Sequence, residues 1–446
     1  MNFEDLTQAL LDAARRAGAE QADAIAVSSR DVGVSVREGA LEEAEGAEST
    51  DYGLRVLIGK KQACVSASDP ALDVIAELAE RAVAMANAAP EDPWCGLADA
   101  ADLAKPSAAP NLEMLDGADT MSPDALRDMA LAAEAAATEV RGVSQVESAG
   151  AGWRRSTVAL AMTNGFQGGY ERSSTSCSVS AVAGEGLGME TDYDFVSRVW
   201  AADLPDLVEI GASAGQRAAE RLNPGKAKTG AYPVLFHNRV SGGLVGHIMG
   251  ALSGSAVARG SSWLSEKMDQ QIIPANFSLT DDPHRVRGAA SRPFDGEGMA
   301  IAPRALIEDG VLRGWQMDTA TARQLGLKAP GGGRRGVSAP PSPGSSNLTL
   351  TQGDRSFEDM VRDMGEGLII TSLIGASINA NTGAYSRGAS GFWVENGEIS
   401  HPVNELTIAG SLPEFLMTMV PANDADFTES LIAPSLLVEG LTVASG

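Results

Sequence analysis

The apolar positions near the start of the chain predict a helix, then strands, then a second helix. Residues 3–17 carry apolar side chains three and four positions apart, the spacing of one helix face, and Gly18 is a typical helix end. Valines alternate with polar residues over 32–36, and residues 52–68 indicate a hairpin. A second helix is expected to start at Pro70, so this segment combines helices with antiparallel strands.

The same order of elements returns after a linker. Residues 88–121 are rich in Ala, Pro and Asp and lack a sustained period, which indicates a linker or an extended segment. Helices are then expected over 122–138 and 205–222. Between them the alternation predicts four strands, at 143–149, 156–162, 170–182 and 193–200.

From Ala231 onward the pattern changes to short strands and turns. Asp309-Gly310 and Asn396-Gly397 are typical of tight hairpin turns, and residues 328–346 have the composition of a flexible loop. We therefore predict an α+β fold, in which two small helix-and-strand units precede a larger, mostly β C-terminal domain. The expected boundaries are 1–90 for the first unit, 91–121 for the linker, 122–225 for the central unit and 226–446 for the C-terminal domain.

Charge limits the classes of partner. The chain has 59 acidic and 34 basic side chains and a formal net charge of −25, so its field repels nucleic-acid phosphates and anionic lipids. The uncharged run 367–386 contains Ser, Thr, Asn and Gly, which argues against a membrane span. We expect neither nucleic acid nor a membrane as a partner.

The first residues of the chain and its cysteines predict the cellular compartment in which the protein works. Glu4 and Asp5 lie where an export signal requires basic residues, so we expect a protein that is not exported. The three cysteines, Cys64, Cys95 and Cys177, are far apart and predict neither a zinc cluster nor a disulfide framework. A reducing, cytoplasmic location follows as an expectation.

Two glycine-containing motifs suggest chemistry that their context weakens. "GASAG", residues 211–215, matches the nucleophile elbow of serine hydrolases, but it lies inside a predicted helix rather than between a strand and a helix. "GGGRRG", residues 331–336, offers backbone N–H groups and the cations Arg334 and Arg335 to an anion. A mobile loop over a peptide carboxylate, or a loop without a specific role, is the interpretation we favour for the second motif.

The four histidines do not form a metal motif by spacing. His237, His247, His284 and His401 give no H-x-x-x-H and no H-E-x-x-H pattern. "DDPH" brings Asp281 and Asp282 close to His284, which a divalent metal could use. The same residues are also typical of a turn capped by an aspartate, and we favour that interpretation.

His247 lies in "SGGLVGHIMGAL", a predicted helix with an unusual glycine pattern. Gly242, Gly246, Gly250 and Gly254 recur every four residues and would line one ridge. Each glycine costs a helix about 1 kcal/mol relative to alanine, so the pattern predicts close contact with another backbone.

Long stretches of the sequence resemble the TldD/PmbA family, once called modulators of DNA gyrase. The stretch "NTGAYSRGASGFWVENGEISHPVNELTIAG", residues 381–410, carries the resemblance, supported by "SLTDDPH" and "GVLRGWQMDTATARQLG". In that family a catalytic TldD-type subunit pairs with a PmbA-type subunit, also called TldE. The resemblance implies a zinc-dependent peptidase that acts on small or unfolded peptides.

The residues that the family uses to bind zinc are missing from this chain. The catalytic type carries H-E-x-x-x-H and a much later cysteine ligand, whereas this chain has Gly242, Gly243 and His247 at those positions and no cysteine after Cys177. One imidazole cannot hold zinc against water, and without the glutamate no group takes the proton of the water. We therefore expect no catalytic residue and no metal ligand here, with zinc on the partner subunit.

The resemblance implies a non-catalytic subunit that forms a heterodimer with a TldD-type metallopeptidase and handles peptide substrates, a homodimer being a further arrangement. In this interpretation His247 is a remnant or a supporting residue. Two other hypotheses stay open: a self-sufficient hydrolase that uses His247 with Asp281, Asp282 or His284, and a binding modulator of DNA gyrase.

Overall fold

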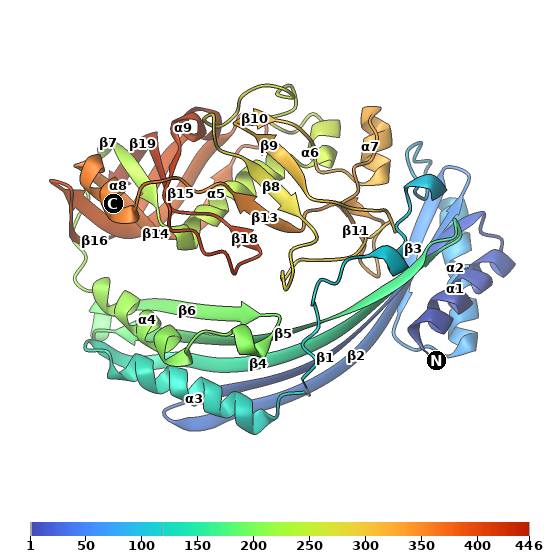
Figure 1. Ribbon diagram of the computed structural model, residues 1–446, viewed down its shortest axis with the longest axis horizontal. Helices are drawn as coiled ribbons and strands as arrows, with labels where there is room; N and C mark the ends of the chain where they lie inside the picture. The colour runs from blue at the N-terminus through green and yellow to red at the C-terminus, as the bar shows by residue number, and fades with distance from the viewer. Residues whose placement is uncertain (1, 119, 446) are drawn as a thin grey trace.

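The N-terminal half is built on one long antiparallel sheet. The computed structural model describes residues 2–118 and 120–445. Strand β1 pairs with β4, so the strands of the first and central units form a single sheet in the order β3-β2-β1-β4-β5-β6. Figure 1 shows this sheet as a curved layer with the C-terminal domain over its concave side. Its strands are β1 (Gln21–Arg37), β2 (Ala40–Ile58), β3 (Lys61–Ala67), β4 (Val143–Met162), β5 (Gln167–Ala183) and β6 (Glu190–Arg198).

Helices cover one face of this sheet in two pairs. Successive residues of a strand point to opposite faces: Ala24 and Ala26 of β1 join the core under the first helix pair, whereas Ile25 faces the other side and packs near Phe294 of the C-terminal domain. The first pair lies at one end of the sheet and the second at the other (Figure 1). The helices are α1 (Phe3–Ala17), α2 (Leu72–Ala88), α3 (Pro123–Glu139) and α4 (Leu207–Glu220).

Two features of this half differ from the prediction. Residues 143–149 and 156–162 were expected as separate strands, but they form the single strand β4, because β1 and β5 pair with it on both sides across residues 150–155. Helix α2 begins at Leu72 rather than Pro70, and the carboxylate of Asp69 accepts the backbone N–H of Ala71 at 3.0 Å.

The C-terminal domain contains a sheet that closes on itself. Its strands follow the order β16-β15-β14-β7-β19-β17, and β16 also pairs with β19. A second sheet has the order β10-β9-β8-β13-β18. The first sheet comprises β7 (Gly230–Phe236), β14 (Gly367–Ile378), β15 (Ala384–Glu395), β16 (Glu398–Ser411), β17 (Val420–Pro421) and β19 (Leu436–Ser445). The second comprises β8 (Leu279–Asp282), β9 (Arg304–Glu308), β10 (Val311–Leu312), β13 (Asn347–Leu350) and β18 (Leu431–Ile432).

The fold is therefore α+β, with helix-and-strand units first and a larger, β-rich C-terminal domain after them, as predicted. Its helices are α5 (Asn238–Ala251), α6 (Gly254–Ala258), α7 (Thr319–Leu325), α8 (Phe357–Met364) and α9 (Leu412–Phe415). Leu244, Val245 and Ile248 of α5 belong to the largest apolar core, together with side chains of both C-terminal sheets. In the described residues, no helix is long and apolar enough to cross a membrane.

The segment 328–346 has a defined structure, in contrast to the flexible loop that its composition predicts. It contains the short hairpin of β11 (Gly333–Arg334) and β12 (Ser342–Pro343). The buried carboxylate of Asp295 accepts the backbone N–H groups of Gly332 at 2.8 Å and Gly333 at 3.0 Å. Gly332 has a φ of +128°, a conformation that a side chain would strain. These contacts place the hairpin between the C-terminal domain and the sheet.

Candidate functional site

Helix α5 carries Gly242, Gly243 and His247, the positions at which the sequence resemblance placed the family's metal motif. It follows β7 directly, and His237 caps its first turn, because Nδ1 of this residue accepts the backbone N–H of Arg239 at 3.3 Å. One face of α5 is buried in the core, whereas Gly246 and Gly250 on the other face are exposed. His247 lies between these faces and is half-buried.

The imidazole of His247 has aromatic and cationic neighbours. Its ring meets that of Tyr385 edge-on, with centroids 5.7 Å apart. Its Nε2 atom is buried and has no hydrogen-bond partner in the described residues. Burial lowers the pKa of His247, and the positive charge of Arg387 lowers it further. The ring is therefore neutral at pH 7.

Gly242 and Gly243 lie against groups that are not metal ligands. A Cβ atom at Gly243 would be 4.0 Å from a guanidinium nitrogen of Arg387, and one at Gly242 would be 3.1 Å from Cδ2 of Leu431. Arg387 is held in place because its Nε donates to the carbonyl of Gly375 at 2.6 Å. A fixed cation thus lies beside the position of the general base in the catalytic type.

These residues do not fit a zinc ion. Zinc sites need three or four nitrogen, sulfur or oxygen ligands, and the described residues contain no group of three or more His, Cys, Asp or Glu side chains that could hold a metal. The cysteines Cys64, Cys95 and Cys177 are unpaired and precede α5 in the chain. The fixed charge of Arg387 would also repel a divalent cation.

The glycine ridge is only partly in contact with other backbone. A Cβ atom at Gly254 would be 2.7 Å from the carbonyl oxygen of Gln316, so this glycine permits a close approach. Cβ atoms at Gly246 and Gly250 would meet nothing within 4 Å. Two of the four predicted ridge positions therefore face open space in the single chain. The prediction of one continuous ridge was wrong, because α5 ends at Ala251 and Gly254 belongs to α6.

The "DDPH" segment forms a turn at the end of β8. Asp282 accepts the backbone N–H of His284 at 2.8 Å, as in a capped turn. Asp281 accepts the backbone N–H of Ser346 at 2.8 Å and also the hydroxyl of that residue. The carboxylates of this segment therefore organise backbone, and they do not group with His247 around a metal position.

The two arginines of "GGGRRG" have different surroundings. Arg335 is buried and its Nε forms an ion pair with Asp23 of β1 at 2.9 Å, which ties the hairpin to the sheet. Arg334 is exposed and donates from Nε to the carbonyl of Ser345 at 3.2 Å. The "GASAG" motif lies within α4, where Gly211 packs directly on the backbone of Ala133 in α3.

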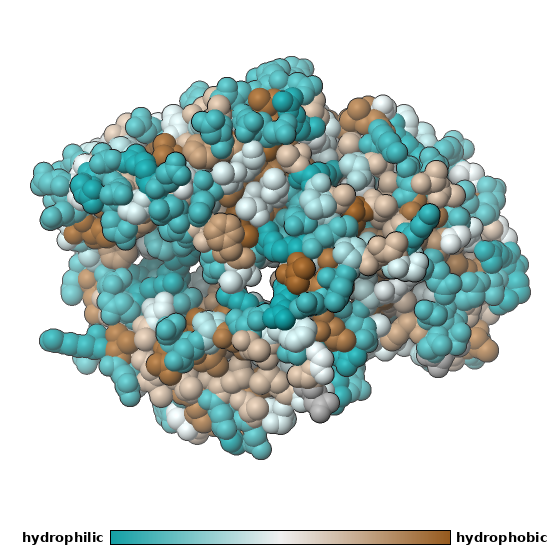
Figure 2. Space-filling view, viewed as in Figure 1, coloured by the Kyte–Doolittle hydropathy of each residue, from teal (hydrophilic) through white to brown (hydrophobic). Residues whose placement is uncertain are grey.

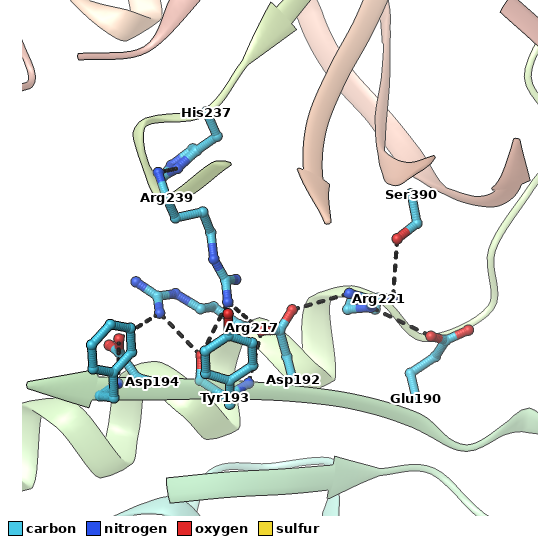
Figure 3. A network of polar contacts seen from close by, with 10 residues as sticks. Glu190, Asp192, Tyr193, Asp194, Arg217, Arg221, His237, Arg239 and Ser390 are labelled. Atoms are coloured by element: carbon cyan, nitrogen blue, oxygen red, sulfur yellow. Dashed lines mark hydrogen bonds and ion pairs between the residues drawn. The ribbon is translucent and has the colours of Figure 1, made fainter. Parts of the chain in front are cut away.

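A cluster of charges joins the start of α5 to the sheet, and sequence analysis did not detect it. Asp192 of β6 accepts from Arg239 at 2.7 Å and from Arg221 at 3.2 Å, and Arg221 also donates to Ser390 of β15 at 3.1 Å (Figure 3). Burial alone would raise the pKa of Asp192, but the hydrogen bond and charge of Arg239, with help from Arg221, lower it. Asp192 and Arg239 are 47 positions apart, so no local motif relates them.

Comparison with known families identifies the class of this protein. The model of the PmbA/TldA metallopeptidase C-terminal domain matches residues 229–445, that of the central domain matches 116–222, and that of domain 1 matches 22–86. The chain therefore belongs to the PmbA/TldD metallopeptidase family.

Individual relatives span nearly the whole chain. It is 34% identical to the metalloprotease PmbA of Escherichia coli O157:H7 over 93% of this chain and 90% of the relative. It is 33% identical to a PmbA homologue of Haemophilus influenzae over 99% of this chain and 96% of the relative. A crystal structure of a modulator-of-DNA-gyrase protein from Bacteroides thetaiotaomicron aligns over 99% of both chains, with a TM-score of 0.91 at 26% identity. A TldD homologue of Haemophilus influenzae matches less of the chain, at 27% identity over 46%.

Proposed function

We propose that this chain is the non-catalytic, PmbA/TldE-type subunit of a heteromeric zinc-dependent peptidase that acts on small or unfolded peptides. The proposal rests on the lack of side chains on α5 that could hold a metal. His247 is a single neutral imidazole, Gly242 and Gly243 supply no side chain, and Arg387 places a positive charge beside them. Metal-assisted hydrolysis needs a held cation and a base for its water, and this arrangement supplies neither.

The relatives support the assignment to the PmbA type. Within Haemophilus influenzae, the PmbA homologue aligns with 99% of this chain and the TldD homologue with 46%. A sequence of the catalytic type would be expected to show the opposite preference. The partner in this proposal is a TldD-type chain that carries the zinc ion.

The exposed side of α5 gives the proposed pair a contact surface. Gly246 and Gly250 leave the backbone of α5 accessible, and glycines on one helix face allow a second backbone to approach closely. In the proposed heterodimer this face packs on the partner, which explains why α5 keeps glycines that cost helix stability. The unpaired cysteines suit the reducing cytoplasm in which we place the pair.

Reconstitution with the TldD-type partner tests the proposed function. We expect no cleavage of an unfolded peptide by this chain alone, and robust cleavage when the partner is added. His247→Ala should leave the activity of the pair within about twofold of wild type, because the ring touches no reacting atom in this account. Cleavage by the isolated chain that His247→Ala abolishes would instead establish a self-sufficient hydrolase.

A further inference from the structure

A cavity of about 320 Å³ lies between the concave side of the sheet and the C-terminal domain. Figure 2 shows the molecule hollowed between these two parts. Strands β1, β4 and β5 form one wall, and the loop 289–296 and the β11–β12 hairpin form the other. Arg172, Arg292 and Arg334 reach it from these walls, and we call it the arginine cavity.

These three guanidinium groups have no carboxylate partner. In the described residues, no Asp or Glu oxygen lies within ion-pair distance of Arg172, Arg292 or Arg334. The chain has 59 acidic side chains and a formal net charge of −25, so three cations without carboxylate partners around one cavity are unexpected. Arg335 lines the same cavity but forms an ion pair with Asp23, a carboxylate that it shares with Arg55.

The acidic side chain in the wall does not compensate them. Asp295 directs its carboxylate to the backbone, where it accepts N–H groups of Gly332, Gly333, Glu297 and Met299. Burial raises the pKa of Asp295, and the four backbone N–H donors act in the opposite direction. The surplus charge of the cavity is therefore positive.

Arg292 is the least satisfied of the three cations. Its Nε atom is buried without a hydrogen-bond partner in the described residues. Burial lowers the pKa of Arg292, and the neighbouring charge of Arg334 lowers it further. A buried cation without a partner destabilises a fold unless something supplies the missing charge. A bound anion would do so.

The loop that carries Arg292 is held rigidly by the "DDPH" turn and β13. Asn347 of β13 accepts the backbone N–H of Ala290 at 3.0 Å and donates to the carbonyl of Asp282 at 2.7 Å and the hydroxyl of Ser291 at 2.8 Å. The backbone N–H of Arg292 donates to the carbonyl of Pro283 at 3.0 Å. This assembly fixes the backbone that carries Arg292 before any ligand arrives, which reduces the entropy lost on binding.

The remaining wall is apolar. Ile25, Val158 and Leu160 of the sheet line the cavity, together with Phe294 and Tyr170, whose rings meet edge-on with centroids 5.6 Å apart. A ligand that fits therefore combines an anionic group with an apolar one. A second cavity of about 400 Å³ shares Arg172 and Ala289 with the first, so the space continues along the sheet.

We propose that the arginine cavity binds the C-terminal carboxylate of a peptide whose last side chain is apolar. The carboxylate contacts Arg292 and Arg334, the apolar side chain packs against Leu160 and Phe294, and the rest of the peptide extends toward the second cavity. This inference rests on the proposed function, since it assumes that the substrates are peptides, and it gives the non-catalytic subunit the role of anchoring their ends.

Matched peptides test the inference on the isolated chain. A fluorescent hexapeptide that ends in phenylalanine is prepared with a free carboxylate and with a C-terminal amide, and fluorescence anisotropy gives both affinities. We expect the free acid to bind about tenfold more tightly, a difference of about 1.4 kcal/mol, since only the acid offers a charged acceptor to the arginines. Arg334→Gln and Arg292→Gln should each reduce this preference, whereas Arg313→Gln, an exposed arginine outside both cavities, should leave it unchanged.

Two results would overturn the inference. One is equal binding of acid and amide to the wild-type chain, or a preference that survives the double variant Arg292→Gln/Arg334→Gln with native thermal unfolding. The other is binding of inorganic phosphate when neither peptide binds. Cleavage of either peptide by the isolated chain would refute the proposed function instead, and the two failures are therefore distinguishable.

Discussion

At the scale of single residues, the environment of each charged or polar group decides its role. His247 lies where the resemblance to the family places a ligand of the catalytic type. Burial and Arg387 lower its pKa, and the described residues contain no group of three or more His, Cys, Asp or Glu side chains that could hold a metal. Arg335 and Arg334 are neighbours in sequence but have different surroundings. Arg335 forms an ion pair with Asp23, whereas Arg334 donates to the carbonyl of Ser345 and can contact a ligand. Sequence analysis singled out His247 and the two arginines as candidate positions. It could not separate structural from binding roles, because these depend on residues distant in the chain.

Arg292→Met is expected to stabilise the isolated protein. The substitution keeps a long side chain and removes a cation whose Nε atom is buried without a hydrogen-bond partner, and a buried donor without a partner costs about 1–3 kcal/mol. Thermal unfolding measures the change, with Arg313→Met as the control at an exposed, paired arginine. A lower melting temperature for Arg292→Met alone would show that the cation already has a stabilising partner.

The raised pKa of Glu297 predicts that the protein loses stability as pH rises. Burial, together with the charges of Asp295 and Asp318, raises the pKa of Glu297 to about 8. Above pH 4.5 the unfolded state has released this proton, whereas the folded state keeps it until the pH approaches 8. The stability that the bound proton provides is therefore lost as pH rises from 4.5 toward 8. Glu297→Gln mimics the protonated form and should flatten the decline of the unfolding free energy between pH 5 and pH 8. The same decline in Glu297→Gln, or flattening by the exposed control Glu308→Gln, would contradict the assignment.

At the scale of elements, periodicity and turn chemistry predicted most helices and hairpins. Helix α1 ends at Gly18, with a φ of 103°, and α3 begins after the Ser122 cap, as expected. The prediction failed where tertiary contacts outweigh local signals. Strand β4 continues through Gly150 and Gly152 because both of its neighbours bond to it, and the glycine-rich segment 328–346 is ordered by Asp295 and Asp23.

Helix α5 allows a test that separates folding from assembly. Gly246→Ala should stabilise the isolated chain by about 0.5–1 kcal/mol, because alanine favours a helix and its Cβ meets nothing within 4 Å. Gly246→Trp should leave the chain folded but prevent association with the TldD-type partner, measured by analytical ultracentrifugation of the mixture. Gly188→Trp, at another exposed glycine with open space around it, is the control. Undiminished association of Gly246→Trp would exclude this face of α5 from the contact.

At the scale of the whole molecule, the curved sheet and the C-terminal domain together form a cavity that neither part forms alone. The charge cluster of Asp192, Arg221 and Arg239 joins them at one place, and the ion pair of Arg335 with Asp23 joins them at another. Between these contacts lies the arginine cavity. Arg172, which lines this cavity, donates to the carbonyl of Ser291, 119 positions away in the sequence, so no sequence pattern could have revealed this site.

The zinc content of the isolated chain distinguishes a non-catalytic subunit from a metallopeptidase that holds its own metal. The chain is purified without its partner, equilibrated with excess zinc and dialysed, and zinc is then measured by atomic absorption alongside a TldD-type chain treated identically. This account predicts about one zinc ion per TldD-type chain and well below one per copy of this chain, because two glycines and a cation surround its single imidazole. One zinc ion per chain that His247→Ala removes would contradict it.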